Sequence, residues 1–344
     1  MSTPPKLSIC ISTFNRAAFI GETLESIVSQ ATENCEIVVS DNASPDNTEN
    51  VVGQYERRCS CLRYIKHDTD LGMDRNYDRA LELARGEYCW LLSDDDPLKP
   101  GAVASVLKAL ANDFSLVLVN SEARDASLST IIQGRIHDIR ADQVYEPTEM
   151  DRLFSDLKEY VQYLSAYVIK RDIWRERERE RYYGSLYLFV GIVFQKCLPG
   201  KALVMAEPLM YSRFGNFSTF SPNAFEVFTI NWSSVVWSLG ISDVTKRKCV
   251  PKEPWRSPSL LLIWRAISGY SISEYRRCVR PRLRTAWERL IPLLIAVVPI
   301  ALANASCTMY FCGPRQRIMQ WVLRESRFHM RNSRRPPAFG GGSI

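Results

Sequence analysis

The sequence predicts an α/β fold, with a mostly parallel central sheet flanked by helices and a helical, membrane-associating region towards the C-terminus. Two observations support this prediction. Within the first 120 residues, short apolar runs typical of strands alternate with segments whose apolar residues recur at helical spacing. This alternation favours parallel strands joined by helices that cover both faces of the sheet. After residue 222, the apolar segments become longer and rich in Trp, Tyr and Arg.

Five strands are expected in this first part of the chain, at 7–13, 36–40, 62–66, 88–92 and 116–120. Leu7, Ile9 and Ile11 alternate with other residues in the first, as side chains do in a pleated strand. The strand at 88–92 is an unbroken apolar and aromatic run, which indicates burial. It ends at three consecutive Asp residues, and Pro97 prevents its continuation.

Helices are predicted between these strands, at 20–31, 48–57, 73–84 and 103–110. Ile20, Leu24 and Ile27 recur at helical spacing in the first helix, and Gly86 follows the end of the third. Further amphipathic helices are expected in the C-terminal third, at 225–239 and 260–273. The run of alternating Glu and Arg at 176–180 is interpreted as a solvated helix face.

The chain has 344 residues, of which 46% are hydrophobic, enough for two domains or for one large domain with an appendage. We divide it into an α/β domain (1–222), a helical region (223–335) and a disordered tail (336–344). The ten cysteines are scattered, and no cleavable signal is expected before Leu7, which favours a cytoplasmic protein with reduced cysteines. The three histidines lie far apart, which argues against a His-based metal site or a Ser-His-Asp triad.

Three of the predicted strands end in clusters of polar residues. The clusters are Thr13, Asn15 and Arg16; Asp41, Asn42, Ser44 and Asp46; and Asp94, Asp95 and Asp96. In open parallel sheets, ligands bind beyond the carboxyl ends of the strands. Three such clusters at one edge therefore predict a nucleotide site. Alternatively, Arg16 is an ordinary surface residue at the start of a helix.

The residues Asp94, Asp95 and Asp96, here called the Asp run, repel one another and need a cation nearby. A hard divalent ion with oxygen ligands meets that need, and Mg²⁺ typically leaves positions open for substrate phosphates. The alternative is a solvated acidic turn before the helix that begins near Gly101, because short motifs often match by chance.

The positive charge is concentrated at the C-terminal end. Residues 275–335 contain 13 Arg, no Lys and two Glu, whereas the rest of the chain has a net charge of −5. This asymmetry indicates an anionic partner, either nucleic acid or a membrane surface. The tail surrounds an apolar segment suited to lipid, so we expect an anionic membrane surface and no nucleic acid.

That apolar segment is 290–311, which has 22 uncharged residues and is long enough to span a bilayer. Arg residues flank it on both sides, whereas a spanning helix normally has its positive flank on the cytoplasmic side only. Together with Pro292 and Pro299, this pattern favours a hairpin or interfacial insertion with both ends in the cytoplasm. A buried core helix is the alternative.

Four segments resemble motifs of the family 2 glycosyltransferases, which have the GT-A nucleotide-diphospho-sugar transferase fold. They are ICISTFNR (9–16), VVSDNASPD (38–46), DLGMDRN (70–76) and LLSDDDP (91–97). In order and spacing they are jointly specific. In the third, Asp70 replaces the first Asn of the family pattern. A later segment, 207–218, is similar to abequosyltransferase-like enzymes of bacterial O-antigen synthesis.

The resemblance implies transfer of a sugar from a nucleotide-diphosphate sugar to a saccharide acceptor at the cytoplasmic face of the membrane. A saccharide linked to polyprenyl diphosphate is one candidate for that acceptor. The implied sugar-nucleotide-binding residues are Thr13, Phe14, Asn15, Arg16, Asp41, Asn42, Ser44, Asp46, Asp70, Gly72, Asn76, Asp94 and Asp95. The Asp run resembles the Asp-x-Asp motif that binds Mg²⁺ or Mn²⁺. Its register is open: the literal motif selects Asp94 and Asp96, whereas alignment of the preceding strand selects Asp95.

The catalytic base is not identified. Many inverting members of the family use a carboxylate about 90 residues beyond the metal motif, but no Asp or Glu occurs at 181–206. Inversion is therefore implied by the family alone. A non-catalytic membrane-associated protein that binds saccharide or nucleotide sugar is the alternative function. A nucleotidyltransferase and a nicotinamide oxidoreductase are disfavoured, because no Gly-rich loop follows the first strand.

Overall fold

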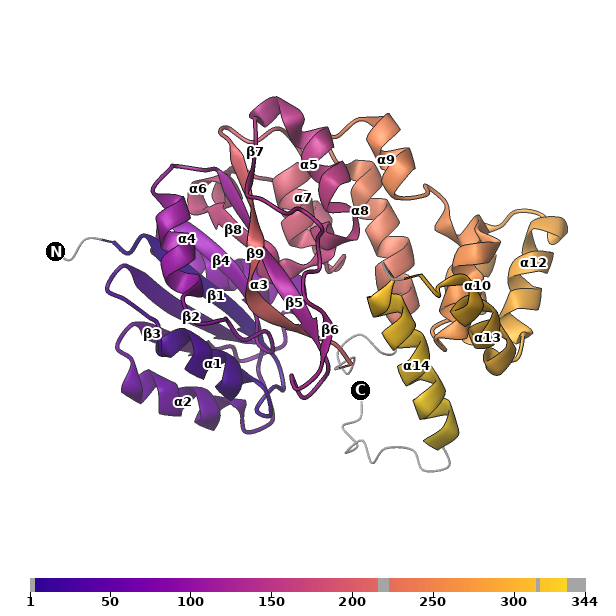
Figure 1. Ribbon diagram of the computed structural model, residues 1–344, viewed down its shortest axis with the longest axis horizontal. Helices are drawn as coiled ribbons and strands as arrows, with labels where there is room; N and C mark the ends of the chain where they lie inside the picture. The colour runs from indigo at the N-terminus through magenta and orange to yellow at the C-terminus, as the bar shows by residue number, and fades with distance from the viewer. Residues whose placement is uncertain (1–3, 216–222, 314–315, 333–344) are drawn as a thin grey trace. The chain divides into compact units, whose positions relative to one another are not determined.

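The computed structural model describes residues 4–215, 223–313 and 316–332 (Figure 1). The chain divides into two compact units. The first, here called the sheet unit, comprises Met1–Phe214 and Ser234–Lys252, and the second, the helical unit, comprises Gly215–Ser233 and Glu253–Ile344. The predicted disordered tail at 336–344 lies outside the described residues.

One sheet organises the sheet unit, and helices flank it (Figure 1). Its strands are β1 (Leu7–Thr13), β2 (Cys35–Asp41), β3 (Leu62–Lys66), β4 (Tyr88–Ser93), β5 (Leu116–Arg124), β6 (Ile131–Gln133), β7 (Gln143–Tyr145), β8 (Tyr167–Lys170) and β9 (Ala202–Arg213). Their order is β3-β2-β1-β4-β8-β5-β9-β7, with β6 paired to β5. The strands from β3 to β4 are parallel, β8 is antiparallel to both neighbours, and β5 and β9 are parallel. The predicted α/β fold with a mostly parallel sheet is confirmed.

The helices of the sheet unit connect and cover these strands. They are α1 (Ile20–Val28), α2 (Thr48–Arg58), α3 (Met73–Leu83), α4 (Ala102–Leu110), α5 (Met150–Leu157), α6 (Arg171–Glu176), α7 (Leu188–Phe194), α8 (Trp232–Ser238, mostly in this unit) and α9 (Asp243–Cys249). Helix α3 packs on β1 and β2, and α1 packs against α2. All residues of β1 and β2 are buried, as expected for strands covered on both faces.

The register of the parallel strands brings their carboxyl ends to one place. Thr13 pairs with Asp41 at the ends of β1 and β2, and Ser12 pairs with Ser93 at the end of β4. The strands after residue 120 were not predicted from sequence. Among them, β8 separates β4 from β5, and β9 ends beside β5.

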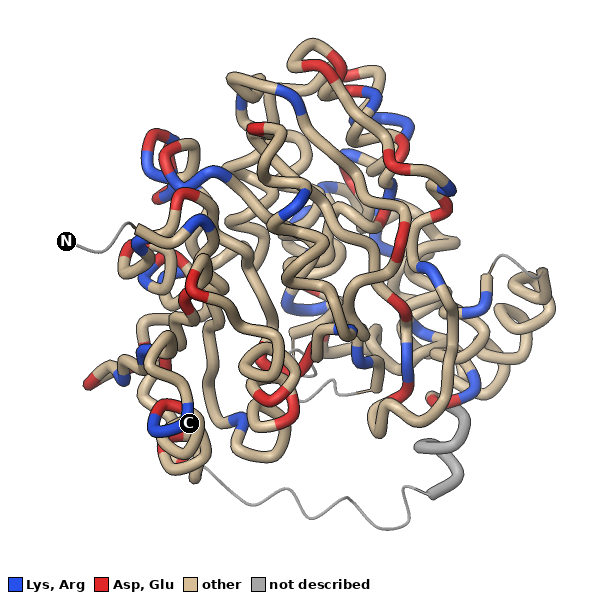
Figure 2. The backbone as a smooth tube through the Cα atoms, turned by 60° about the vertical axis from the view of Figure 1, so that its left-hand side comes forward, with Lys and Arg blue, Asp and Glu red and all other residues tan. Residues whose placement is uncertain are grey.

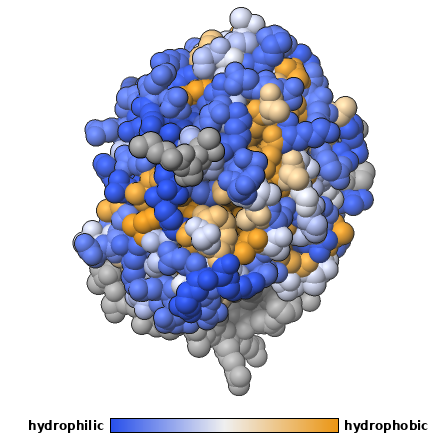
Figure 3. Space-filling view, turned by 90° about the vertical axis from the view of Figure 1, so that its left-hand side faces the viewer, coloured by the Kyte–Doolittle hydropathy of each residue, from blue (hydrophilic) through white to orange (hydrophobic). Residues whose placement is uncertain are grey.

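The surface of the sheet unit is mixed in charge and hydropathy. Lys and Arg residues are interspersed with Asp and Glu along the backbone in Figure 2. The face of the molecule in Figure 3 is largely hydrophilic, with apolar side chains in patches between the polar ones. This pattern agrees with a domain that directs its apolar residues into the sheet and its covering helices.

Glu36 on β2 is buried at the amino ends of the strands, opposite the predicted site. Its carboxylate accepts hydrogen bonds from the Ser8 hydroxyl (2.7 Å) and from the amides of Arg85 (2.5 Å) and Gly86 (3.3 Å). Burial alone would raise the pKa of Glu36, but the hydrogen bonds from Ser8 and Arg85 outweigh it and leave that pKa below its usual value. The ionised carboxylate therefore joins β1, β2 and the start of β4.

We expect Glu36→Ala to lower the free energy of unfolding by at least about 2 kcal/mol, since each buried donor left without an acceptor costs about 1–3 kcal/mol. Urea unfolding measures this, with the exposed Glu82→Ala as control. Folding lowers the pKa of Glu36. Its contribution to the free energy of unfolding is therefore fully present above the pKa of Glu36 in the unfolded protein, and it is lost as the pH falls through the pKa in the folded protein. The two proteins should therefore converge in acid, and a constant difference would contradict this account.

Two predictions for the sheet unit were wrong. Cys59 and Cys61 form a disulfide instead of remaining reduced, because the turn between α2 and β3 brings their Cα atoms to 5.3 Å, within disulfide range. The Glu and Arg run at 176–180 is not a solvated helix face throughout. Helix α6 ends at Glu176, and buried Arg177 donates to the carbonyl oxygens of Lys196 and Cys197.

The helical unit contains a π-helix (Glu226–Asn231), α10 (Pro258–Ala266), α11 (Ile272–Glu274), α12 (Ala286–Val297), α13 (Ile300–Tyr310) and α14 (Arg317–Asn332). The predicted helix at 260–273 is interrupted after α10. The apolar segment forms two helices, α12 and α13, which meet at Pro299 and are bent by 95°. Within the described residues, only this bent pair together, and no single helix, has the length and apolar composition to cross a membrane.

Helices α12 and α13 turn small residues inward and large ones outward. Ala296, Ala303 and Cys307 are buried in the core clusters of the helical unit. Their large apolar residues with high exposure are Trp287 (81%), Leu290 (44%), Ile291 (53%), Leu293 (36%), Leu294 (54%), Val297 (55%), Leu302 (61%), Met309 (74%) and Tyr310 (78%). We call these nine residues the apolar face of the helical unit. So many exposed large apolar side chains on two consecutive helices are unusual for a surface in contact with water alone.

Candidate active site

The predicted polar clusters meet where β1, β2 and β4 end. After β1, the chain turns through Asn15, whose φ is 58°, and the side chain of Arg16, which is 11% exposed, reaches the Asp run. Arg16 Nε lies 3.4 Å from Asp94 Oδ1, and Arg16 Nη2 lies 3.6 Å from Asp95 Oδ2. Phe14 of the same loop is 43% exposed. The turn after β1 thus approaches the end of β4, and Arg16 is not a solvated surface residue.

Asp41, the last residue of β2, shapes the loop that follows it. Its buried carboxylate accepts hydrogen bonds from the Ser44 amide (2.8 Å) and from the Tyr64 hydroxyl. Burial, followed by the bond to Asp41, raises the pKa of Tyr64 well above its usual value, so Tyr64 remains a donor. Ser44 Oγ in turn accepts from the Asn15 amide at 2.8 Å, which joins the loops after β1 and β2.

Asp46 uses both carboxylate oxygens inside this loop pair. Oδ2 accepts from the Ala17 amide and Oδ1 from the Thr48 amide, each at 3.0 Å. Burial raises the pKa of Asp46, but the hydrogen bonds from Thr48 and Ala17 outweigh burial and lower it. Asp46 therefore fixes the starts of α1 and α2, a structural task that the sequence motif does not separate from ligand binding.

The segment at 70–76 lies against the same loops. The side-chain amide of Asn42 donates to Asp70 Oδ1 and accepts from the Leu71 amide at 2.7 Å. The Gly72 amide also donates to Asp70, at 2.8 Å, and Gly72 has a φ of 79° that favours glycine. Asp70, which departs from the family pattern, thus accepts one bond from the loop after β2 and one from its own turn.

Asn76 on α3 is buried beneath β1 and β2. Its amide nitrogen donates to Ser12 Oγ (2.6 Å) and to the carbonyl oxygen of Ser40 (3.0 Å), and its oxygen accepts from Ser40 Oγ (2.7 Å). These bonds occupy both polar atoms of the side chain. Asn76 therefore holds the strands on which the site is built.

The three members of the Asp run have different environments. Asp94 and Asp95 are buried beside Arg16, and Asp95 Oδ1 also accepts from Ser93 Oγ at 2.6 Å. Asp96 is held by structural bonds, from Ser165 Oγ to Oδ2 (2.7 Å) and from the Arg213 amide to Oδ1 (3.0 Å). Burial, followed by repulsion from Asp95, raises the pKa of Asp94 and of Asp96.

A divalent cation fits this set of oxygen donors. Burial, more than the charge of Asp95, raises the pKa of Asp94, and Arg16 does not cancel that rise. In the described ranges, no group of three or more His, Cys, Asp or Glu side chains converges on one point. Any ion at the Asp run would therefore need ligands besides carboxylates. Mg²⁺ is commonly bound by two carboxylates together with substrate phosphates and water.

The segment where the family places its base has no carboxylate. Helix α7 is apolar and buried along its length. Two carboxylates of α3 that sequence reasoning missed contact this segment: Asp74 accepts from the Leu186 amide (2.9 Å), and Asp78 accepts from the Tyr183 hydroxyl. Burial raises the pKa of Asp74 to about 6. Their helical spacing of four residues was the signal available in the sequence.

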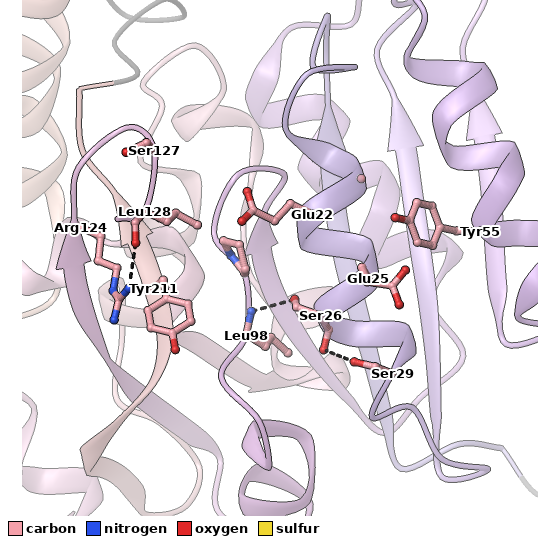
Figure 4. A pocket seen from close by; sticks show the side chains of 12 residues that line it. Glu22, Glu25, Ser26, Ser29, Tyr55, Leu98, Arg124, Ser127, Leu128 and Tyr211 are labelled. Atoms are coloured by element: carbon pink, nitrogen blue, oxygen red, sulfur yellow. Dashed lines mark hydrogen bonds between the residues drawn. The ribbon is translucent and has the colours of Figure 1, made fainter. Parts of the chain in front are cut away.

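A pocket of about 710 Å³ lies between α1 and the turn after β5 (Figure 4). Glu22, Glu25 and Ser26 of α1 line one side, and Arg124 and Tyr211 line the other. None of the predicted site residues lines it. This pocket is therefore a separate feature from the strand-end site.

Residues 8–174 match the family model described as glycosyl transferase family 2. An abequosyltransferase of Salmonella typhimurium is 29% identical over 226 residues, which are 62% of this chain and 68% of that protein. A GalNAc(5)-diNAcBac-PP-undecaprenol β-1,3-glucosyltransferase of Campylobacter jejuni is 32% identical over 133 residues, 38% of this chain and 43% of that protein. The resemblance inferred from the motifs is thereby confirmed.

The fold is also that of solved glycosyltransferases. A structure of S. aureus TarS residues 1–349 with UDP has a TM-score of 0.58 at 15% identity and covers 95% of this chain and 92% of that one. The mannosyltransferase PcManGT of Pyrobaculum calidifontis with GDP-Man and Mn²⁺ has a TM-score of 0.53 at 14% identity, covering 96% and 88%. At these identities the likeness establishes the fold alone.

Proposed function

We propose that this chain, whose residues 8–174 are those of a family 2 glycosyltransferase, transfers a sugar from a nucleotide-diphosphate sugar to a saccharide acceptor in bacterial surface polysaccharide synthesis. The observation that carries the proposal is the meeting of three strand-end clusters, with Arg16 beside Asp94 and Asp95. Such an edge is where an α/β sheet binds a nucleotide. The solved relatives that hold UDP-GlcNAc, UDP or GDP-Man support a donor of this class.

In the proposed reaction, the bond between the anomeric carbon and the diphosphate oxygen breaks, and an acceptor hydroxyl oxygen bonds to that carbon. The departing diphosphate gains negative charge. Asp94 and Asp95 would hold Mg²⁺ or Mn²⁺, which supplies Lewis-acid stabilisation of that charge. Arg16 keeps these carboxylates in place and adds positive charge near the site. The loop of Asp41 would receive the base of the nucleotide.

The proposal includes an inverting outcome, which rests on family membership, and leaves the acceptor's proton without an assigned base. The absence of Asp and Glu from 181–206 favours one alternative, a protein that binds nucleotide sugar without transferring it. One experiment distinguishes sugar transfer from binding alone. The protein is incubated with Mn²⁺, a lipid-linked saccharide extract and a panel of UDP-, GDP-, CDP- and dTDP-sugars. Release of nucleoside diphosphate that depends on the acceptor supports transfer, and binding without release supports the alternative.

The finer part of the proposal concerns the acceptor and the location. The apolar face of the helical unit exposes large side chains on α12 and α13. Exposed Arg276, Arg280, Arg282 and Arg284 precede α12 along the chain. Apolar and basic side chains together suit the surface of an anionic membrane. We therefore propose that the enzyme works at the cytoplasmic face of the membrane on a lipid-linked acceptor, for which a polyprenyl-diphosphate-linked saccharide is one candidate.

Asp41→Ala should raise the KM for the donor more than it lowers kcat, because Asp41 lies in the nucleotide loop and away from the Asp run in sequence. Steady-state kinetics at varied donor concentration measures both constants. Tyr64→Phe is the matched control, since it removes the hydroxyl bond to Asp41 and keeps the carboxylate. A larger effect of Asp41→Ala on kcat than on KM would contradict the assignment.

A further inference from the structure

Arg213, the last residue of β9, joins three parts of the sheet unit. Its side chain is 3% exposed. The guanidinium donates from Nε to the carbonyl oxygen of Asp95 (3.1 Å), from Nη2 to Glu22 Oε2 (2.6 Å) and from Nη1 to the carbonyl oxygen of Ala126. Its backbone amide donates to Asp96 Oδ1 at 3.0 Å. One residue thus connects β9 with the Asp run, α1 and the turn after β5.

We propose that Arg213 is a positioning residue that holds the Asp run in the conformation that binds the divalent metal ion. The inference rests on the proposed function. Arg213 lies in the segment 207–218, which the proposed chemistry does not otherwise use. Its position, more than 100 residues beyond the Asp run, means that the C-terminal half of the sheet unit would set the geometry of the metal ligands.

The contacts of Arg213 restrain the main chain of the Asp run. They do not involve the carboxylates of Asp94 and Asp95, the proposed ligands. The bond from Nε fixes the peptide oxygen of Asp95, and the backbone amide fixes the neighbouring carboxylate of Asp96. With two consecutive residues held, the peptide between them cannot rotate freely. The side chains of Asp94 and Asp95 then keep their place beside Arg16. Groups that orient metal ligands in this way tune metal affinity.

The guanidinium is itself anchored away from the run. Glu22 on α1 supplies an opposite charge, and the Phe19 ring centroid lies 5.3 Å from the guanidinium carbon. Burial of a charge is costly unless its donors are satisfied, and here the three donating nitrogens point to three different segments. A lysine keeps the charge but lacks the planar set of donors. Replacement by Lys therefore tests geometry at constant charge.

The experiment compares Arg213→Lys with Arg124→Lys. Arg124 is the cross-strand partner of Arg213 on β5 and bonds to Glu122 and the Leu128 carbonyl, away from the Asp run. Binding of Mn²⁺ is followed by the electron paramagnetic resonance of the free ion, with UDP and with GDP in separate titrations. We expect Arg213→Lys to bind Mn²⁺ about tenfold more weakly, as for other changes to groups that orient metal ligands. Arg124→Lys should match the parent.

Thermal unfolding of the same proteins separates positioning from stability. A purely structural role predicts a lower Tm with unchanged Mn²⁺ affinity, and that result would overturn the inference. If Arg213→Lys does not fold, Glu22→Gln removes the charge that anchors the guanidinium, and it should weaken Mn²⁺ binding by a smaller factor. Failure of the parent to bind Mn²⁺ with either nucleotide would overturn the proposed metal site as well. If the unmodified protein binds Mn²⁺ and both Arg213→Lys and Glu22→Gln bind it equally well, only the role of Arg213 is overturned.

Discussion

Asp95→Asn should lower kcat by at least about a hundredfold, because removing one group that stabilises transition-state charge typically costs about 10²–10³. Asp95 is buried with Asp94 at the end of β4, and its amide replacement cannot supply the negative charge that binds a divalent ion. The fold should persist, since Asn retains an oxygen for the bond from Ser93 and reduces repulsion with Asp94. Turnover with acceptor and the Tm are the two measurements.

Asp113→Asn is the matched control for this substitution. Asp113 is exposed, and it has a φ of 57°, a conformation that Asn accepts readily. Its turnover should equal that of the parent. Nucleotide affinity of the parent should also fall when excess chelator replaces Mn²⁺. Equal affinity under both conditions would refute metal binding by the Asp run, whatever Asp95→Asn does to turnover.

The first half of the sheet was predictable from sequence because its signals are local. Strands β1 to β4 and helices α1 to α4 each carry their own periodicity, and each predicted polar cluster directly follows a strand. Strands β8 and β9 were missed, because their pairing partners lie far away in the chain. Tyr167–Lys170 has four residues, too few to show a period, and Ala202–Arg213 contains an internal proline.

The site could be located from sequence, but the tasks of its residues could not be separated. Asp46 and Asn76 stand in the motifs beside Asp41 and Asp94, yet the structure uses their polar atoms to hold loops and strands. The same residue types serve ligand binding and loop support, so a motif identifies both together. Arg213 reaches the Asp run because β9 pairs with β5 and also bonds to the segment 97–99 that follows the run, and no local pattern encodes either contact.

The proposed metal ligands, Asp94 and Asp95, correspond to neither register of the motif alone. Both oxygens of Asp96 accept bonds from Ser165 and Arg213, whereas Asp94 and Asp95 face Arg16. This favours Asp94 and Asp95 as ligands and gives Asp96 the part of an anchor for the turn. The raised pKa of Asp94 follows from burial with like charges, a situation that a bound cation relieves.

The largest effect outside the site is expected in the helical unit. Replacing both Ile291 and Leu294 on α12 by Glu should weaken binding to anionic vesicles by at least about tenfold, since burying one such side chain contributes roughly 1.5–3 kcal/mol. These side chains are 53% and 54% exposed, so the fold of the unit should tolerate the change. Cosedimentation with vesicles of phosphatidylglycerol and phosphatidylethanolamine at low salt measures the binding.

The control replaces Ile131 and Val244 by Glu, which adds the same charge at apolar positions of the sheet unit that are 55% and 62% exposed. If general repulsion from anionic lipid were the cause, both double variants would lose binding equally.

High salt should also weaken the binding of the unmodified protein to vesicles, because Arg residues near the surface contribute roughly 1 kcal/mol each. With a short, water-soluble acceptor, the variant with Glu at 291 and 294 should turn over as fast as the unmodified protein. With a lipid-linked acceptor, its turnover should fall. Parent protein that stays in the supernatant at low salt would show that the apolar face meets a partner other than a membrane.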